Sequence, residues 1–239
     1  LSDGYDFMRG GVFLVPRKFT LANYTYFLEQ QRWINSIGVS VARTVIGTIG
    51  TVLVTSMVSY ALARRDLMFR KTYRFLFIMA MYVSGGMIAF YVMLRIYGIL
   101  NTFAVYILPL LLNLFFIMVG TSFFESIPTS LLESAQLDGA SELKTFFRIV
   151  IPVSLPFLAT LALFSAVGQW NAWIDSAYYV NSDELRTISY RMMSEVNKTM
   201  NVDASGQTAT GAQSEASSVT GVTMNATVTM ISTLPIMMV

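Results

Sequence analysis

The chain has 239 residues, of which 54% are hydrophobic and only 13% are charged, a composition typical of a membrane protein rather than a soluble one. The net charge of +2 is too small to indicate nucleic-acid binding, and the absence of Cys and His excludes disulfides, thiolate metal sites and His-based catalytic arrangements. The chain also lacks a G-x-x-x-x-G-K-[ST] phosphate-binding loop, so we expect no catalytic residue, no metal site and no cofactor in this chain, and any ATP chemistry must belong to a partner.

The first part of the chain is predicted to lie outside the membrane and then to cross it. Residues 1–35 are polar with interspersed aromatics, which predicts an extramembrane segment. Residues 37–63 are the first apolar run that is long enough to cross a hydrocarbon core of about 30 Å. Arg43 lies near the outer end of this run, where a long side chain is expected to snorkel towards water. Gly47 and Thr51 lie four residues apart and predict a small-residue face for close helix contact.

Two further apolar runs follow a basic loop. Residues 64–74 have the highest density of positive charge in the chain, and the positive-inside rule therefore places this loop in the cytoplasm. Residues 75–95 form the second run, and the glycine pair at 85–86 predicts a kink or a close helix approach near its middle. Residues 103–124 form the third run, which contains Asn113 as its only amide and returns the chain to the cytoplasmic side.

The stretch 125–152 is the least apolar one between two long apolar runs, and it predicts two short helices. Ser130 and Glu133 have the capping-box spacing that starts a helix. The Asp-Gly pair at 138–139 predicts a turn, because glycine readily adopts a left-handed conformation. Pro152 ends the second helix or opens the next one. The second helix is predicted to carry one apolar stripe, formed by Leu143, Phe146, Phe147 and Val150.

This stretch also carries the longer pattern E-x-A-x3-G-x9-I-x-x-P. The pattern resembles the cytoplasmic coupling loop of bacterial ABC importer permeases, whose usual form is EAA-x3-G-x9-I-x-L-P. Ser134 and Ile151 are the two departures from that form. The resemblance implies that the matching residues couple the chain to a partner ATPase. They are Glu133, Ala135, Gly139, Ile149 and Pro152.

Other stretches resemble the same family. The pattern F-L-x-P-x-x-F-T-L-x-N-Y at 13–24 is similar to the segment after the first span of carbohydrate-type permeases, and the sequence YALAR at 60–64 also resembles the family. Residues 84–88 and 98–102 resemble the branch that transports complex oligosaccharides, although Ala89 stands where that branch commonly has Pro.

The fourth apolar run, residues 153–174, ends in tryptophan and polar side chains. Polar groups at this depth are costly unless they face protein or water, which predicts the lining of a transport pathway. An interfacial aromatic belt is the alternative interpretation, and for Trp173 both stay open. The family resemblance includes a Trp-Asn pair that matches Trp170 and Asn171. The predicted pathway residues are Trp170, Asn171, Trp173, Asn113 and Asn225.

The rest of the chain completes the predicted topology. Residues 176–218 read as an outer loop, and 219–239 read as a fifth span. Because the 37–63 helix should end inside, we expect a sixth helix upstream of the sequence and further residues beyond its end. The expected organisation is an extracytoplasmic segment, 1–35, followed by a transmembrane permease domain, 36–239, that includes the coupling loop 125–152 and the outer loop 176–218.

The expected fold is therefore an all-α, polytopic transmembrane helix bundle of the type I ABC importer permease kind, in a bacterial inner membrane. The resemblance implies a transport subunit rather than an enzyme, forming half of the pathway for an oligosaccharide, with an acidic, alginate-like sugar as one candidate. The implied partners are a second permease subunit, two ATPase subunits that bind ATP and Mg²⁺, an extracytoplasmic binding protein and membrane lipid, but no nucleic acid.

Three alternatives remain open at this point. Peptide, polyamine and phosphate permeases share the coupling loop, so a non-sugar solute is an alternative substrate. A secondary carrier would need coupling-ion ligands and internal repeats, neither of which is clear in the sequence. A membrane enzyme would need a reactive pair of side chains, and Asp175 has no evident carboxylate partner in a neighbouring span.

Overall fold

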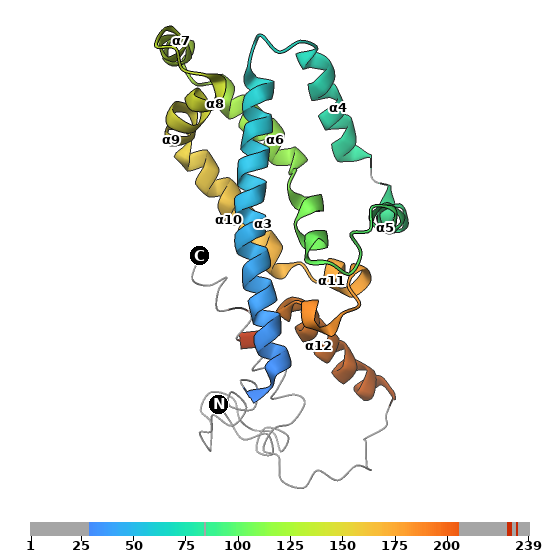
Figure 1. The fold of residues 1–239 in the computed structure, drawn as a ribbon. Coiled ribbons are helices and arrows are strands. Elements are labelled where there is room, and N and C mark those ends of the chain that lie inside the picture. Colours follow the sequence, from blue (N-terminus) through green and yellow to red (C-terminus); the bar gives the residue numbers. More distant parts are fainter. Residues whose placement is uncertain (1–28, 84, 206–228, 231–232, 234–239) are drawn as a thin grey trace. The chain divides into compact units, whose positions relative to one another are not determined.

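A computed structural model describes residues 29–83, 85–205, 229–230 and 233, with only the backbone described for 198–205 (Figure 1). Every regular element in these ranges is helical, which confirms the predicted all-α class. The chain divides into two compact units, residues 42–170 and residues 1–41 with 171–239. The elements are α3 (Gln31–Ala63), α4 (Arg70–Tyr82), α5 (Gly86–Ile96), η1 (Phe103–Tyr106), η2 (Leu108–Leu110), α6 (Leu114–Glu125), α7 (Thr129–Leu137), α8 (Glu142–Thr145), η3 (Phe146–Val150), α9 (Ile151–Val153), α10 (Leu155–Asn171), α11 (Ile174–Tyr179), η4 (Asp183–Leu185) and α12 (Ile188–Ser205).

Helix α3 is long and apolar enough to cross a membrane by itself. Its 33 residues extend about 50 Å at the usual rise per residue. Three bent pairs have the length and composition of a span if each pair is taken together: α4 with α5, the η1–η2 segment with α6, and the α8–α9 segment with α10. The described residues thus contain one to four spans, and the predicted fifth span, 219–239, lies almost wholly outside them.

Helix α3 buries polar side chains and exposes apolar ones. Thr51 and Thr55 are buried, and their hydroxyls donate to the carbonyls of Leu110 and Leu111 at 2.9 and 3.2 Å. The predicted small-residue face around Thr51 therefore contacts the segment before α6. The opposite pattern is typical of a helix in water, so this arrangement fits a helix whose outer face meets hydrocarbon. The exposed apolar residues of α3 include Val45, Ile46, Ile49, Leu53 and Met57.

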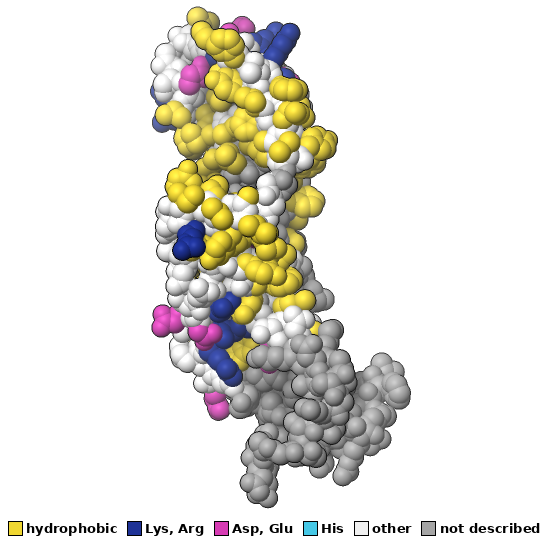
Figure 2. Space-filling model, turned by 90° about the vertical axis from the view of Figure 1, so that its right-hand side faces the viewer, with side chains coloured by type: hydrophobic (Ala, Val, Ile, Leu, Met, Phe, Trp, Pro, Cys, Tyr) yellow, Lys and Arg dark blue, Asp and Glu magenta, His cyan; other side chains and the backbone are white. Residues whose placement is uncertain are grey.

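Helices α4 and α5 expose most of their side chains. No residue of α4 is buried, and Leu94 is the buried residue of α5. Figure 2 shows hydrophobic side chains covering much of the face that carries these two helices. The break between Tyr82 and Gly86, where Gly86 has a φ of +73°, agrees with the predicted kink at the glycine pair.

The hydrophobic core of residues 42–170 lies where the end of α3 meets α6, α10 and the stretch 125–152, which carries the coupling pattern and is called the coupling segment below. Tyr60 packs against Phe124 and Phe146, with ring centroids 6.3 and 5.4 Å apart. Phe124 in turn meets Phe157 of α10 edge to face at 5.6 Å. The remaining buried members of this core are Ile127, Val150, Leu158 and Leu161.

Gly120 permits the close contact of three helices at this core. A Cβ atom at this position would lie 2.7 Å from Cζ of Phe157 in α10 and 2.8 Å from Oγ of Ser59 in α3. Since real Cβ atoms do not approach other atoms so closely, the absence of a side chain at Gly120 is what lets α6 fit between its two neighbours.

The other unit, residues 1–41 with 171–239, joins the first turns of α3 to α11, η4 and α12. The backbone NH of Ile188 donates to the Ser40 hydroxyl at 2.9 Å, and the Arg191 guanidinium donates to the Ser36 hydroxyl. Helix α12 therefore begins against the start of α3. Helix α3 itself starts at Gln31, before the predicted start of the first span at residue 37.

Candidate functional site

Helix α7 ends in a glycine turn, as predicted. The NH of Gly139 donates to the carbonyl of Gln136 and the NH of Ala140 to that of Ala135, both at 3.0 Å. Gly139 has a φ of +73°, a left-handed conformation that strains residues with a side chain. A Cβ atom placed there would have nothing within 4 Å, so glycine is required for the backbone conformation and not for space.

The predicted capping box at the start of this helix is wrong. Helix α7 begins directly after Pro128, which is its N-cap, and no side chain caps it. Ser130 and Glu133 consequently lie inside the helix and are exposed, because the extended backbone at Pro128 starts the helix before Ser130 can take the cap position. A side-chain cap occurs instead at α8, where the Ser141 hydroxyl accepts from the NH of Lys144 at 3.4 Å.

The second predicted helix is irregular, and this overturns the predicted four-residue stripe. A π-helical turn, η3, follows the single turn of α8, and a wider turn changes which side chains share a face. Phe146 and Val150 are 1% and 0% exposed, whereas Leu143 and Phe147 are 60% and 49% exposed. The two outward residues and Leu137 at the end of α7 are exposed apolar side chains of the coupling segment.

The Glu142 carboxylate, in α8, joins α7 and α8 to the end of α3. It accepts hydrogen bonds from the Tyr60 hydroxyl at 3.0 Å, the Arg64 guanidinium at 2.7 Å and the Gln136 amide at 3.2 Å. Arg64 also lies 3.7 Å from the Asp66 carboxylate. This Glu142 network was not predicted, because its donors are separated from Glu142 by as many as 82 residues in the chain.

The basic stretch 64–74 is a loop only as far as residue 69, because Arg70 begins α4, and the first turns of α4 tie α3 to α6. Arg70 and Arg74 both form ion pairs with Glu125 at the end of α6. Both also donate to the Leu62 carbonyl in the last turn of α3, at 3.0 Å. Cations at these two helix ends are favourable because helix C-termini carry partial negative charge.

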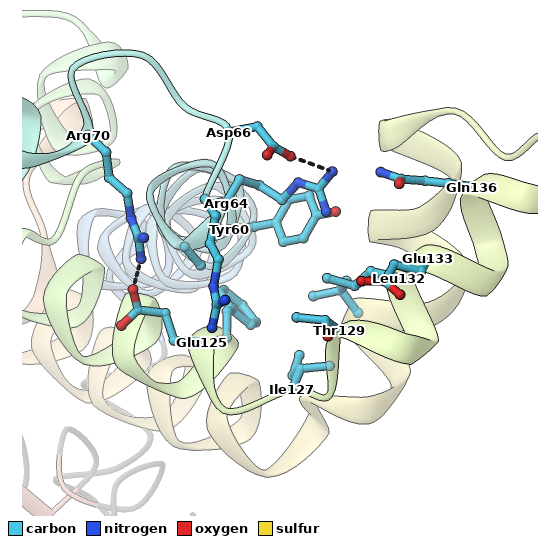
Figure 3. A pocket seen from close by; sticks show the side chains of 14 residues that line it. Tyr60, Arg64, Asp66, Arg70, Glu125, Ile127, Thr129, Leu132, Glu133 and Gln136 are labelled. Carbon is cyan, nitrogen blue, oxygen red and sulfur yellow. Dashed lines mark ion pairs between the residues drawn. The ribbon is translucent and has the colours of Figure 1, made fainter.

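A cavity of about 520 Å³ lies between α7 and the end of α3 (Figure 3). Thr129, Leu132, Glu133 and Gln136 point into it from α7, and Tyr60, Arg64 and Asp66 face them from the opposite wall. The donors of the Glu142 network line this cavity, so the network bridges α7 and α3 beside the open space. The charged lining residues are Arg64, Arg65 and Arg70 with Asp66, Glu125 and Glu133.

The five residues of the coupling pattern are spread along this segment and do not converge on one point. Ala135 is the buried one, at 5% exposure, and its carbonyl accepts from the NH of Ala140 after the glycine turn. Glu133 lines the cavity, and Gly139 forms the turn. Ile149 is partly buried in the π-helical turn, and Pro152 lies in the first turn of α9, where proline is tolerated.

The predicted pathway residues occupy different environments. Trp170 is buried at 9% exposure and Asn171, which ends α10, is exposed. Trp173 is partly buried and precedes α11. The Asn113 side chain caps α6 by accepting from the NH of Phe116 at 3.1 Å. The fifth residue, Asn225, lies outside the described residues, and the pathway role of all five stays a prediction.

Arg43 does not snorkel, contrary to the sequence-based expectation. Its side chain is fully buried, its Nε donates to Oε1 of Gln169 at 2.9 Å, and its guanidinium carbon lies 4.6 Å from the centroid of the Tyr106 ring. The expectation is wrong because α10 and η1 supply these partners inside the protein, where a buried cation must be compensated.

Replacing Gly47 with alanine should break this arrangement. A Cβ atom there would lie 2.5 Å from Nε2 of Gln169, so the Gln169 side chain must move, and we expect this movement to break its hydrogen bond with Arg43. We expect Gly47→Ala to lower the free energy of unfolding by about 1–3 kcal/mol, measured from thermal melts of the purified protein in detergent.

The matched control is Gly38→Ala on the same helix, because a Cβ atom at residue 38 has nothing within 4 Å. This change should be neutral or slightly stabilising, since alanine favours the helix. Equal melting temperatures for the two variants would contradict the assignment of Gly47 as a contact point for Gln169.

Comparisons with known proteins match most of the chain to membrane components of transport systems. The family model described as "Binding-protein-dependent transport system inner membrane component" matches residues 52–236. The chain is 40% identical over 168 residues to the polygalacturonan/rhamnogalacturonan transport system permease protein YtcP of Bacillus subtilis (strain 168), an alignment that covers 70% of this chain and 59% of that protein. It is 40% identical over 169 residues to the protein LplC of the same organism, covering 71% and 57%.

A solved structure has a similar fold over nearly the whole chain. It is a chain from the crystal structure of a bacterial ABC transporter involved in the import of the acidic polysaccharide alginate, with a TM-score of 0.87 and 25% sequence identity. The match covers 99% of this chain and 83% of that one. The matched part of this chain thus spans somewhat less than two thirds of the length of the two curated relatives given above, and most of the length of the solved chain.

Proposed function

The chain belongs to the family of binding-protein-dependent transport system inner membrane components, and from this premise we propose that it is a permease subunit of an ATP-driven importer for an acidic oligosaccharide. One matched protein is named a permease and another belongs to an ABC transporter, and both are transport components rather than enzymes. The names of two of them support an acidic substrate, since polygalacturonan and alginate both consist of uronic acids.

The observation that carries the proposal is the connection between the coupling pattern and α3. Helix α7 is followed by the left-handed turn at Gly139 and is tied through the Glu142 network to the end of α3, the helix that can span a membrane by itself. In this mechanism α7 lies in a groove of a partner ATPase. When ATP binding closes the two ATPases, the displacement of α7 passes through the network to α3 and switches the pathway between inward-open and outward-open states.

The exposed apolar side chains of the coupling segment support docking of a partner there. Leu137, Leu143 and Phe147 are 89%, 60% and 49% exposed. The same segment contacts the basic stretch through the bond between Glu142 and Arg64. Large apolar side chains gathered on a surface outside the lipid are typical of protein–protein contacts. In this assembly the partner ATPases bind ATP and Mg²⁺, a second permease subunit forms the other half of the pathway, and an extracytoplasmic protein delivers the sugar at a bacterial inner membrane.

The coupling role is tested by two substitutions at Gly139. Gly139→Val should reduce sugar uptake by the reconstituted complex at least about tenfold, because a β-branched residue is strongly disfavoured at positive φ and would change the direction of the chain after α7. Gly139→Asn should keep most of the uptake, since asparagine tolerates the left-handed conformation.

Uptake and binding-protein-stimulated ATP hydrolysis are measured for both variants in proteoliposomes. If the valine variant matched the wild type in both assays, the coupling role would be wrong. A secondary carrier is distinguished by purifying this chain with and without ATPase subunits and measuring transport by each preparation. Transport by this chain alone would support the carrier.

A further inference from the structure

The unit that contains α11 and α12 has a charged pocket of about 220 Å³ that none of the sequence motifs includes. The pocket is formed between the start of α3, η4 and α12. Among the residues that the structure describes, its lining carries three arginines and two acidic residues, a net charge of +1, beside two aromatic rings. The arginines are Arg32, Arg186 and Arg191, the acids are Asp183 and Glu195, and the rings are those of Trp33 and Tyr190.

One of the three arginines is neutralised within the pocket. Arg191 forms an ion pair with Asp183 at 3.0 Å and also donates to the Asp183 carbonyl at 2.8 Å. The pKa of the Asp183 carboxyl is held below its ordinary value, first by this hydrogen bond and further by the charges of Arg186 and Arg32. The guanidinium groups around Asp183 therefore stabilise the charged form of its carboxyl group.

The other two arginines form no ion pair with another residue that the structure describes. Arg186 donates to the Ser176 carbonyl at 2.7 Å, and its guanidinium carbon lies 4.2 Å from the centroid of the Tyr190 ring. Arg32 donates to the side-chain oxygen of Gln30 at 2.8 Å. Within the described part of the chain, neither guanidinium lies within 4.0 Å of a carboxylate. Both have N–H groups left for a further acceptor, because guanidinium carries five.

We propose that this pocket binds a carboxylate of the uronic-acid sugar during import, an assignment that rests on the proposed function. The planar fork of a guanidinium matches a carboxylate and binds it through two parallel hydrogen bonds. Arg186 is held in place by its contacts with Ser176 and Tyr190, which reduces the entropy lost on binding. The pocket is smaller than the roughly 300 Å³ at which sites for drug-sized ligands begin, so it suits one sugar unit of a chain.

The experiment measures direct binding of tri-galacturonate to the assembled transporter in lipid nanodiscs, without the binding protein. Wild-type binding should weaken as salt rises, because the pocket is partly open to solvent. Arg186→Gln and Arg32→Gln should each lower the affinity about tenfold, and Arg186→Lys should lower it less, because the charge remains while the fork is lost. The matched control is Arg95→Gln, an exposed arginine of α5, which should bind like the wild type.

The methyl ester of the same trisaccharide distinguishes the carboxylate from the sugar ring. The ester should bind the wild type about tenfold more weakly than the acid does. Its affinities for the wild type and for Arg186→Gln should be equal. Equal affinities of wild type and both glutamine variants for tri-galacturonate, or an equal loss for acid and ester, would overturn the assignment. Undetectable binding of tri-galacturonate to the wild type would also overturn the assignment. If the glutamine variants lost affinity only for the binding protein, the pocket would be a contact for that protein and the assignment would be wrong.

Two measurements keep this assignment separate from the proposed function. Size-exclusion chromatography and basal ATP hydrolysis report whether each variant still assembles. Uptake of tri-galacturonate is then measured in proteoliposomes with the binding protein. If the wild type takes up no acidic oligosaccharide, the proposed function itself fails; if it does, and the glutamine variants bind and transport equally well, only the pocket assignment is wrong.

Discussion

Glu142→Ala is expected to reduce sugar uptake by the reconstituted importer at least about tenfold while leaving binding-protein-stimulated ATP hydrolysis largely intact. The alanine removes the acceptor of three hydrogen bonds that connect α7 and α8 to the end of α3. Hydrogen bonds to a charged group contribute more than neutral ones, but the Glu142 side chain is half exposed, so we expect a loss of about 2 kcal/mol from the whole network. The ATPases would then move α7 without moving α3.

The individual contacts of Glu142 can be separated by a double-mutant cycle. Tyr60→Phe and Arg64→Gln each remove one donor, so each should reduce uptake less than Glu142→Ala does. In a protein that already carries Glu142→Ala, either substitution should have little further effect on uptake. Glu184→Ala, which removes an exposed carboxylate in η4, is the matched control and should transport like the wild type. Additive effects of Tyr60→Phe and Glu142→Ala would show that Glu142 acts through other residues.

Gly120→Leu is expected to prevent stable folding of the permease. Even the first atom of a side chain at this position would lie 2.7 Å from the Phe157 ring and 2.8 Å from the Ser59 hydroxyl, so the larger side chain must separate α6 from α3 and α10. Overpacking of a tight core typically costs about 1–3 kcal/mol and occasionally more, and this site joins three helices at once. The measurement is the yield of monodisperse protein after detergent extraction, with the melting temperature of whatever remains.

Gly168→Leu provides the comparison for this variant. Gly168 is also a helical glycine, in α10, but a Cβ atom there would have nothing within 4 Å. The same substitution should therefore leave the yield and melting temperature close to those of the wild type. Similar losses from both substitutions would mean that leucine is tolerated poorly in these helices for a reason other than contact at Gly120.

The sequence alone predicts those features that depend on neighbouring residues. The left-handed turn at Gly139 follows from the needs of a helix end, and the break before Gly86 follows from a glycine pair in an apolar run. The family resemblance follows from five residues whose spacing is maintained across 20 positions, 133 to 152, although these residues occupy different environments in the structure.

The sequence is less informative where contacts come from distant parts of the chain. The snorkelling expected of Arg43 fails because its partner Gln169 lies 126 residues further on. The predicted stripe of the second coupling helix assumes a regular helix, and the π-helical turn from Phe146 to Val150 removes that regularity. The Glu142 network and the arginine pocket were missed for the same reason, since their members belong to separate helices and no local spacing relates them.

The cavity beside α7 implies that the resting position of this helix depends on ionic strength. Glu133 is the lining carboxylate carried by α7 itself, and the charges of the opposite wall, Arg64, Arg65 and Arg70 against Asp66 and Glu125, leave that wall with one excess positive charge. Helix and wall therefore attract each other across the open space, and dissolved ions weaken the attraction, with a screening length of about 10 Å at 0.1 M. Dilute buffers should draw α7 inward, and concentrated salt should let it swing further from α3.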